Sequence, residues 1–123
     1  MRLRANGSTP TIGVGAYSEG LNDDLNKAIW SGLAETPSLS VNELVQQYAR
    51  YHFGADAEDA MVEALFGLEQ NWVGDIRTNA HVLSTLAALQ QAEALATKSG
   101  EISKNWRLQM YLYRGYYDAF VQW

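Results

Sequence analysis

A polar cluster, Tyr17 to Asn22, contains the carboxylate whose position is the best candidate for chemistry in this sequence. Glu19 follows a short apolar run, Thr11 to Ala16, and precedes a segment with the pattern of a helix. In a barrel enzyme the side chains at the carboxyl ends of the strands face the substrate, so Glu19 is a candidate for a substrate-facing residue. A surface carboxylate in a turn explains the same position more simply, and spacing alone favours that interpretation.

The remaining titratable residues fit structural roles better than catalytic or metal-binding ones. Asp23 and Asp24 are adjacent, but negative charge in the first turn of a helix explains them, and a glycosidase pair needs a separation that the sequence does not give. Neither His52 nor His81 has a second ligand three or four residues away in a metal-like pattern, so we expect no metal site. The acidic group at 56–63 lacks the ligand spacing and central glycine of a calcium loop. No Ser/His/Asp pattern is visible, although such triads form in space rather than in sequence.

Aromatic residues are concentrated in the last stretch of the chain, 106–123. Sugars stack on exposed aromatic rings, but aromatic residues at helical spacing more often belong to a core. The steps of four, three, four and three predict one buried helix face made of Trp106, Met110, Tyr113, Tyr117 and Phe120. Further aromatic residues lie on other sides of the same helix, which indicates that a second surface covers part of it.

Composition places the chain among globular proteins and excludes several function classes. The 123 residues are 47% hydrophobic and 19% charged, which is enough for one domain with a core. The net charge of −5 disfavours a nucleic-acid partner, because phosphates require a basic surface. The absence of cysteine excludes disulfides and thiol chemistry. No apolar run reaches the ~18 residues that cross a bilayer, and Met1 to Arg4 are not followed by the apolar region of a signal peptide.

Start and stop signals predict two helices in the first half of the chain. The first runs from Leu21 or Asn22 to Gly32, with Asn22 as its N-cap. Its inward stripe is expected to be Leu25, Ile29 and Leu33. Ser40 and Glu43 form the pattern of a capping box before the second helix, which ends at Gly54. The inward face of the second helix is expected to be Leu44, Tyr48 and Tyr51.

Three further helices are expected after Gly54. The third is capped by Asp56, the fourth spans Thr78 to Lys98, and the fifth runs from Ser103 to the end. The predicted inward faces of the third and fourth are Met61, Ala64, Leu65, Leu68 and Trp72, and Val82, Leu83, Leu86, Leu89, Ala92 and Leu95. The short connections favour antiparallel neighbours, so the predicted fold is mainly α: an antiparallel bundle of about five helices with a short extended N-terminal segment. Residues 1–10 are predicted to be a flexible tail, and residues 11–123 a single helical domain.

Several segments resemble parts of large bacterial glycoside-hydrolase-like proteins. They are Tyr-Ser-Glu-Gly-x-Asn-Asp-Asp-x-Asn-Lys at 17–27 with Trp30, the segments 48–54 and 68–72, and Asn-Trp-Arg at 105–107 with Tyr-Arg at 113–114. The layout is similar to the α-N-acetylglucosaminidase type, in which a (β/α)8 barrel runs into an all-helical C-terminal domain. The similarity covers about residues 12–123.

The resemblance implies a position for each segment of the N-terminal part. Thr11 to Glu19 looks like a late barrel strand, and residues 20–34 look like the helix behind it. Tyr17, Glu19 and Asn22 are then similar in placement to substrate-contacting positions at the barrel mouth, and no residue matches a defined catalytic acid or nucleophile. A complete barrel takes roughly 200 to 250 residues, so the chain resembles the C-terminal part of such a protein.

The sequence thus leads to two main functional hypotheses. A third, an intact small enzyme, is weaker because no triad or metal set is recognisable. The first is a helical C-terminal domain or fragment of a carbohydrate-active protein, structural and inactive alone, without cofactor or metal. Its expected partners are a barrel domain or a second copy of the chain, and a carbohydrate, with neither nucleic acid nor membrane. The alternative is a self-standing helical bundle that acts through protein–protein contacts. Order in the segment from Ile12 to Tyr17 distinguishes them, because a strand without its sheet has no neighbours to pair with.

Overall fold

A computed structural model describes residues 15–18, 20, 23–96 and 104–123, and within them the chain is mainly α-helical. The helices are α1 (Asp24–Glu35), α2 (Val41–Phe53), α3 (Glu58–Gln70), α4 (Val82–Ala96) and α5 (Trp106–Gln122), with two short 3-10 turns, η2 (Ala55–Ala57) and η3 (Ile76–Thr78). The predicted fold class, a mainly-α helical bundle, is confirmed. Gly15 and Ala16, the described end of the predicted strand, have no regular structure; residues 1–10 of the predicted tail lie outside the described ranges.

The chain divides into two compact units, Met1–Tyr48 and Ala49–Trp123, and the division falls inside α2. In the first unit, α1 and the first part of α2 pack closely, since a Cβ atom on Gly32 would overlap the side chain of Leu44. The hydroxyl of Tyr48 donates a 2.7 Å hydrogen bond to the carboxylate of Asp24. The predicted stripe of Leu25, Ile29 and Leu33 is half-buried rather than buried. The predicted cap, Asn22, lies outside the described residues.

The capping box at the start of α2 is confirmed. The backbone N–H of Ser40 donates to Glu43 Oε2 at 2.8 Å, and the backbone N–H of Glu43 donates to Ser40 Oγ at 3.2 Å. The Ser40 hydroxyl also donates to the same carboxylate at 2.7 Å. The Ser40 N–H bond is the largest of the effects that lower the pKa of Glu43 below its ordinary value, because it favours the ionised carboxylate. At the other end, Gly54 has a φ of 91°, which stops α2 at the predicted residue.

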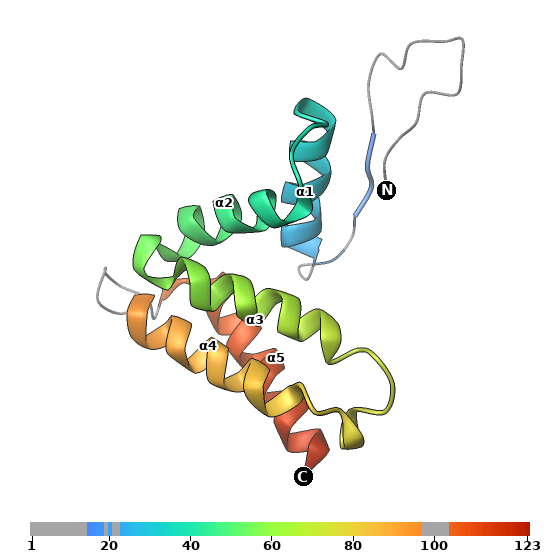
Figure 1. Cartoon of the computed structure of the whole chain (residues 1–123), viewed down its shortest axis with the longest axis vertical. Coiled ribbons are helices and arrows are strands. Elements are labelled where there is room, and N and C mark those ends of the chain that lie inside the picture. Colours follow the sequence, from blue (N-terminus) through green and yellow to red (C-terminus); the bar gives the residue numbers. More distant parts are fainter. Residues whose placement is uncertain (1–14, 19, 21–22, 97–103) are drawn as a thin grey trace. The chain divides into compact units, whose positions relative to one another are not determined.

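In the second unit, α4 packs against both α3 and α5 and runs antiparallel to each of them (Figure 1). The core of these helices combines small and large apolar side chains, Ala60, Met61, Ala64, Leu65, Leu68, Val82, Ala88, Leu89, Ala92, Leu108, Leu112 and Ala119. Two glycines allow the helices to approach closely. A Cβ on Gly67 of α3 would meet Thr85 of α4 at 2.5 Å, and a Cβ on Gly115 of α5 would overlap Leu89 of α4. A larger residue at either position would force the helices apart.

Several predicted details of the second unit are wrong. α3 follows the turn η2 and begins after Ala57, with no side-chain cap from Asp56. Tyr51 is exposed because Phe53 takes the inward position and packs edge-on against Tyr111, with ring centroids 6.3 Å apart. α4 begins at Val82, four residues later than expected, because η3 occupies 76–78. Trp72 and Leu83 are exposed rather than inward.

The predicted buried face of α5 is also wrong. Met110 is half-buried, and Trp106, Tyr113, Tyr117 and Phe120 are exposed, with 72% of Tyr113 and 79% of Phe120 accessible. The buried residues of α5 are Leu108, Tyr111, Leu112, Gly115, Asp118 and Ala119. Because Gly115 and Ala119 lie on this second face, it can approach α4 more closely than a face of large aromatic rings.

Candidate functional site

Of the three predicted substrate-contacting residues, the structure describes Tyr17. Its side chain is 81% exposed and lies in a segment without regular structure just before α1. The next residue, Ser18, donates a 2.6 Å hydrogen bond to Asp23 Oδ2 at the start of α1. Glu19 and Asn22 lie outside the described residues, so their geometry relative to Tyr17 stays a prediction.

The adjacent carboxylates Asp23 and Asp24 have structural partners. Asp23 precedes α1 and accepts from the hydroxyl of Ser18, and Asp24 accepts from the phenol of Tyr48. Each bond ties a neighbouring segment to the first turn of α1, where negative charge also suits the helix dipole. This geometry supports the structural interpretation of the pair over a catalytic one.

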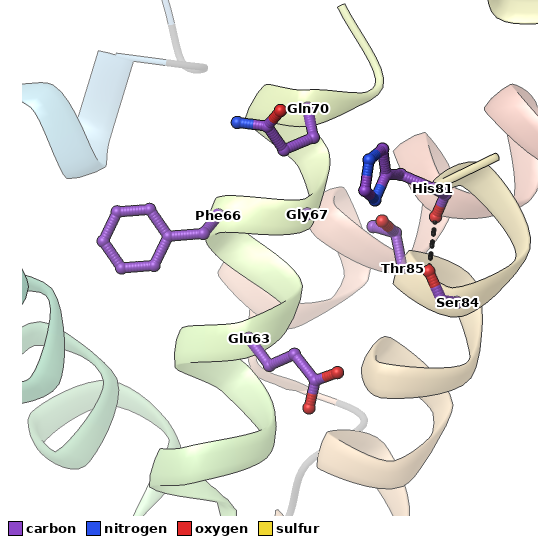
Figure 2. Close-up of a pocket in the computed structure, with 7 residues that line it drawn as sticks. All are labelled: Glu63, Phe66, Gly67, Gln70, His81, Ser84 and Thr85. Carbon is purple, nitrogen blue, oxygen red and sulfur yellow. Dashed lines mark hydrogen bonds between the residues drawn. The ribbon is translucent and has the colours of Figure 1, made fainter. Parts of the chain in front are cut away.

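A shallow groove of about 220 Å³ lies between α3 and the start of α4 (Figure 2). Its lining residues are Glu63, Phe66, Gly67, Gln70, His81, Ser84 and Thr85. A carboxylate, an imidazole and a hydroxyl therefore border one groove, which is the set of groups that nucleophilic catalysis uses.

The hydrogen bonds of this groove do not form a catalytic relay. Ser84 Oγ donates to the backbone carbonyl of His81 at 2.9 Å, so its proton is directed away from the imidazole. The Thr85 hydroxyl donates to the side chain of Asn71 at 3.2 Å. The ring of Phe66 points away from His81, so it does not form a platform for a ligand there (Figure 2). Within the described ranges, no group of three or more His, Asp or Glu residues is placed to hold a metal ion.

A buried polar network connects the three helices of the second unit. Asp118 of α5 has no exposed surface, and its two oxygens accept from Arg114 Nε at 2.6 Å and from Asn71 Nδ2 at 3.0 Å. Asn71, which follows α3, in turn accepts from Thr85 of α4. The guanidinium of Arg114 lies over the ring of Trp72, 4.4 Å from its centroid. One face of an exposed tryptophan is therefore covered by a cation that a buried carboxylate holds in place.

Sequence reasoning missed this network for a physical reason. Arg114 and Asp118 are spaced as an i, i+4 pair, a spacing that is common on solvated helix surfaces. Asn71 is 47 residues from Asp118, and nothing local indicates that they meet. The small residues Gly115 and Ala119 near Asp118 could have indicated that this side of the helix is buried, because small residues mark a face that packs closely.

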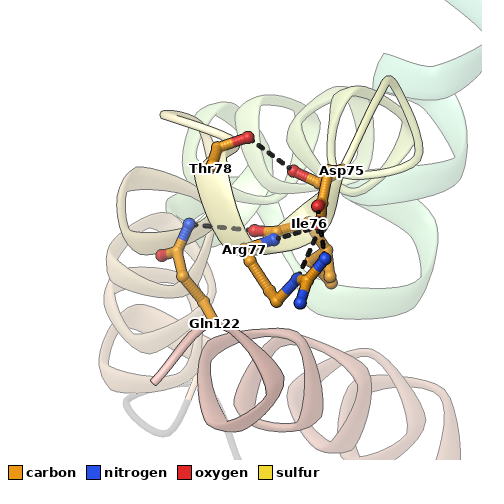
Figure 3. A network of polar contacts seen from close by, with 5 residues as sticks. All are labelled: Asp75, Ile76, Arg77, Thr78 and Gln122. Atoms are coloured by element: carbon orange, nitrogen blue, oxygen red, sulfur yellow. Dashed lines mark hydrogen bonds and ion pairs between the residues drawn. The ribbon is translucent and has the colours of Figure 1, made fainter.

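The connection between α3 and α4 is held by α5 and by its own side chains. Gln122 Nε2 donates to the carbonyl of Ile76 at 3.1 Å (Figure 3). The same nitrogen donates to the carbonyl of Asn79 at 2.7 Å. Asp75 caps η3 and also pairs with the guanidinium of Arg77 at 2.8 Å. The side-chain hydrogen bond from Arg77 lowers the pKa of Asp75, and the same bond raises the pKa of Arg77. These contacts fix the backbone next to the exposed Trp72.

The outward side of α5 carries several exposed aromatic side chains. We define the α5 seam as Trp106, Met110, Tyr113, Tyr117 and Phe120. The rings of Tyr113 and Tyr117 stack, with centroids 6.4 Å apart and planes inclined by 24°. Tyr116 and Trp123 beside the seam are also exposed. This composition of tyrosine, tryptophan, phenylalanine, methionine and nearby arginine is typical of the centre of a protein interface.

No protein-family model, curated protein or solved structure matches this chain. Among the described residues, no helix combines the length and the apolar character that crossing a membrane requires.

Proposed function

We propose that this chain is the helical C-terminal domain of a carbohydrate-active, glycoside-hydrolase-like protein, and that it has a structural role and no activity alone. The observation that supports a contact role best is the exposed aromatic side of α5. Tyr113 and Phe120 leave more than 70% of their surfaces accessible, although burying such rings is strongly favourable. Their exposure is understandable if another surface covers them. The carbohydrate assignment is supported by the sequence resemblance in the segment from Tyr17 to Lys27.

Three of the described carboxylates have structural partners, which supports the proposed absence of glycoside hydrolysis by the chain alone. Hydrolysis requires two carboxyl groups about 5 to 10 Å apart that face one bond. Asp23 and Asp24 accept hydrogen bonds from Ser18 and Tyr48, and Asp118 is buried in an ion pair. We expect a catalytic pair of this type to include residues from another domain, and Glu19 is the residue of this chain that we expect nearest to such a site.

An assay of the purified chain against a panel of aryl glycosides tests the absence of activity. We expect no turnover above buffer for the unmodified chain and for a Glu19→Gln variant. Turnover that is present in the unmodified chain and lost in Glu19→Gln would refute the proposal, because the chain would then be a compact enzyme.

Sugar binding is tested separately by electrophoresis through gels that contain soluble polysaccharides. If Tyr17 contacts sugar, one or more polysaccharides will retard the chain, and Tyr17→Ala will reduce the retardation. Tyr51→Ala is a matched control, since both tyrosines have more than 80% of their surface exposed. Equal retardation of both variants would remove Tyr17 from the site, and no retardation by any polysaccharide would remove the carbohydrate part of the proposal.

The second candidate function is that of a self-standing helical bundle acting through protein–protein contacts. The α5 seam favours it as well, because its composition fits a protein interface and does not require a sugar. The two candidates differ in their dependence on Tyr17. A chain that binds a protein through α5 and shows no polysaccharide binding supports the second candidate.

A further inference from the structure

The spacing of the α5 seam indicates that its occupant is another helix. Its members recur at steps of four, three, four and three, which is a period of 3.5 residues over the length of α5. This is the period of a seam along which two helices pack with interlocking side chains. The buried face of α5 has different members, so the seam is an additional face and not a part of the bundle core.

The exposed aromatic area of α5 and its following residue reaches that of a standard interface. Six aromatic residues, Trp106, Tyr113, Tyr116, Tyr117, Phe120 and Trp123, together leave unburied the equivalent of about four whole aromatic side chains, or about 800 Å². The four of them that belong to the seam account for about 500 Å² of this area. A stable, specific interface buries about 800 Å² on each partner. An exposed apolar surface above a few hundred Å² is unusual for a monomer. The seam therefore supplies more than half of the area that a dimer needs, and Tyr116 and Trp123 beside it supply the rest.

The charge of the seam favours a second copy of this chain as the occupant. The chain has a net charge of −5, so two copies repel at most approaches. α5 contains one acidic residue, Asp118, which is buried and paired with Arg114. The other basic residue of α5, Arg107, lies over the ring of Trp106, 4.4 Å from its centroid. Two copies that meet along this helix therefore bring aromatic surface together without placing carboxylates of α5 against each other.

We infer that two copies of the chain associate through the α5 seam, helix against helix, around a two-fold axis. A two-fold interface is the commonest arrangement of identical chains, and it requires one patch that is complementary to itself. The stacked pair of Tyr113 and Tyr117 lies near the middle of the seam, where an axis would bring the same residues of both copies together. This inference does not depend on the carbohydrate assignment.

Sedimentation velocity and light scattering of the purified chain test the association directly. At about 100 µM protein, roughly a hundred times a Kd of 1 µM, we expect a species of twice the chain mass that dissociates on dilution. The double variant Tyr113→Glu/Phe120→Glu should be monomeric at the same concentration, because it places carboxylates within the apolar contact. Tyr51→Glu is the control: it changes an equally exposed tyrosine outside the seam and should remain dimeric.

Circular dichroism of all three proteins checks that they are folded, which exposed positions should allow. A second variant addresses the position of the axis. Since the chain has no cysteine, Tyr113→Cys should form a disulfide-linked dimer on mild oxidation much faster than Tyr51→Cys.

A monomeric unmodified chain at about 100 µM would overturn the inference and leave the seam to a different partner. A dimer that survives Tyr113→Glu/Phe120→Glu with unchanged affinity would overturn it as well, because association would then use another surface.

Discussion

Removal of the buried carboxylate of Asp118 is the sharpest test of the polar network in the second unit. In Asp118→Ala, Asn71 Nδ2 loses its acceptor while the residue remains 98% buried, and an unsatisfied buried donor costs about 1 to 3 kcal/mol. Arg114 also loses its partner, but a third of its side chain is exposed and can be solvated by water. Breaking a buried ion pair typically costs about 3 to 5 kcal/mol, so we expect a loss near the lower end, about 3 kcal/mol.

Urea unfolding followed by circular dichroism measures this loss as a lower midpoint with an unchanged slope. The Tm should fall by about 12 °C, since one kcal/mol corresponds to roughly 4 °C in a chain of this length. The control Asp56→Ala removes an exposed carboxylate and should change stability by no more than about 0.5 kcal/mol. The double variant Asp118→Leu/Arg114→Met should lose much less than Asp118→Ala, because an apolar pair leaves no uncompensated charge. A loss below about 1 kcal/mol in Asp118→Ala would refute the buried network.

The remaining predictions concern the start of α2 and the packing of α3 on α4. Ser40→Ala should cost about 1 kcal/mol in urea unfolding, because the N–H of Glu43 loses its acceptor, and Ser38→Ala in the preceding turn should be neutral; equal effects would refute the cap. Because the folded-state pKa of Glu43 lies below its ordinary value of 4.5, the stabilisation by its carboxylate is present above that value and is lost as the pH falls through the folded pKa. The Tm difference between Glu43→Gln and the unmodified chain should therefore vanish in acid, and a constant difference down to the lowest pH would contradict this. Gly67→Ala should cost about 1 to 3 kcal/mol by overpacking against Thr85, whereas a neutral or stabilising change would place the two helices farther apart than described.

Much of the fold was predictable because local signals determine it. The capping box at Ser40 and Glu43 and the glycine at 54 act within a few residues, so their sequence pattern is sufficient to place both ends of α2. The inward residues of α3 were correct up to Leu68, since α3 has a single apolar stripe. Trp72 was placed inward because the stripe was extended beyond the end of the helix at Gln70.

The candidate site was predictable only in part, because its members are brought together by tertiary structure. Tyr17 is an exposed residue before a helix, and its predicted contact with a substrate stays a prediction, because no sequence pattern specifies which side chains face it. The contact between Trp72 and Arg114 joins positions 42 residues apart in the sequence. It depends on the packing of α5 against the end of α3, and local propensity contains no information about that packing.

The orientation of α5 shows where hydrophobicity alone gives the wrong answer. α5 has two possible inward faces, the aromatic stripe and the face with Gly115 and Ala119. The aromatic stripe has the larger apolar area, which predicts that it is buried. The observed choice follows from shape: Gly115 and Ala119 let α5 approach α4 so closely that Leu89 occupies the space beside Gly115. Burying the aromatic stripe instead would separate these helices and leave the small residues facing solvent. Asp118 lies on the face that is buried, and its charge argues against burial of that face. A charged residue is rarely buried without a partner, and the local sequence does not identify one. Once Arg114 and Asn71 satisfy that carboxylate, the small-residue face becomes the core, and the aromatic stripe remains outside, where it can serve association.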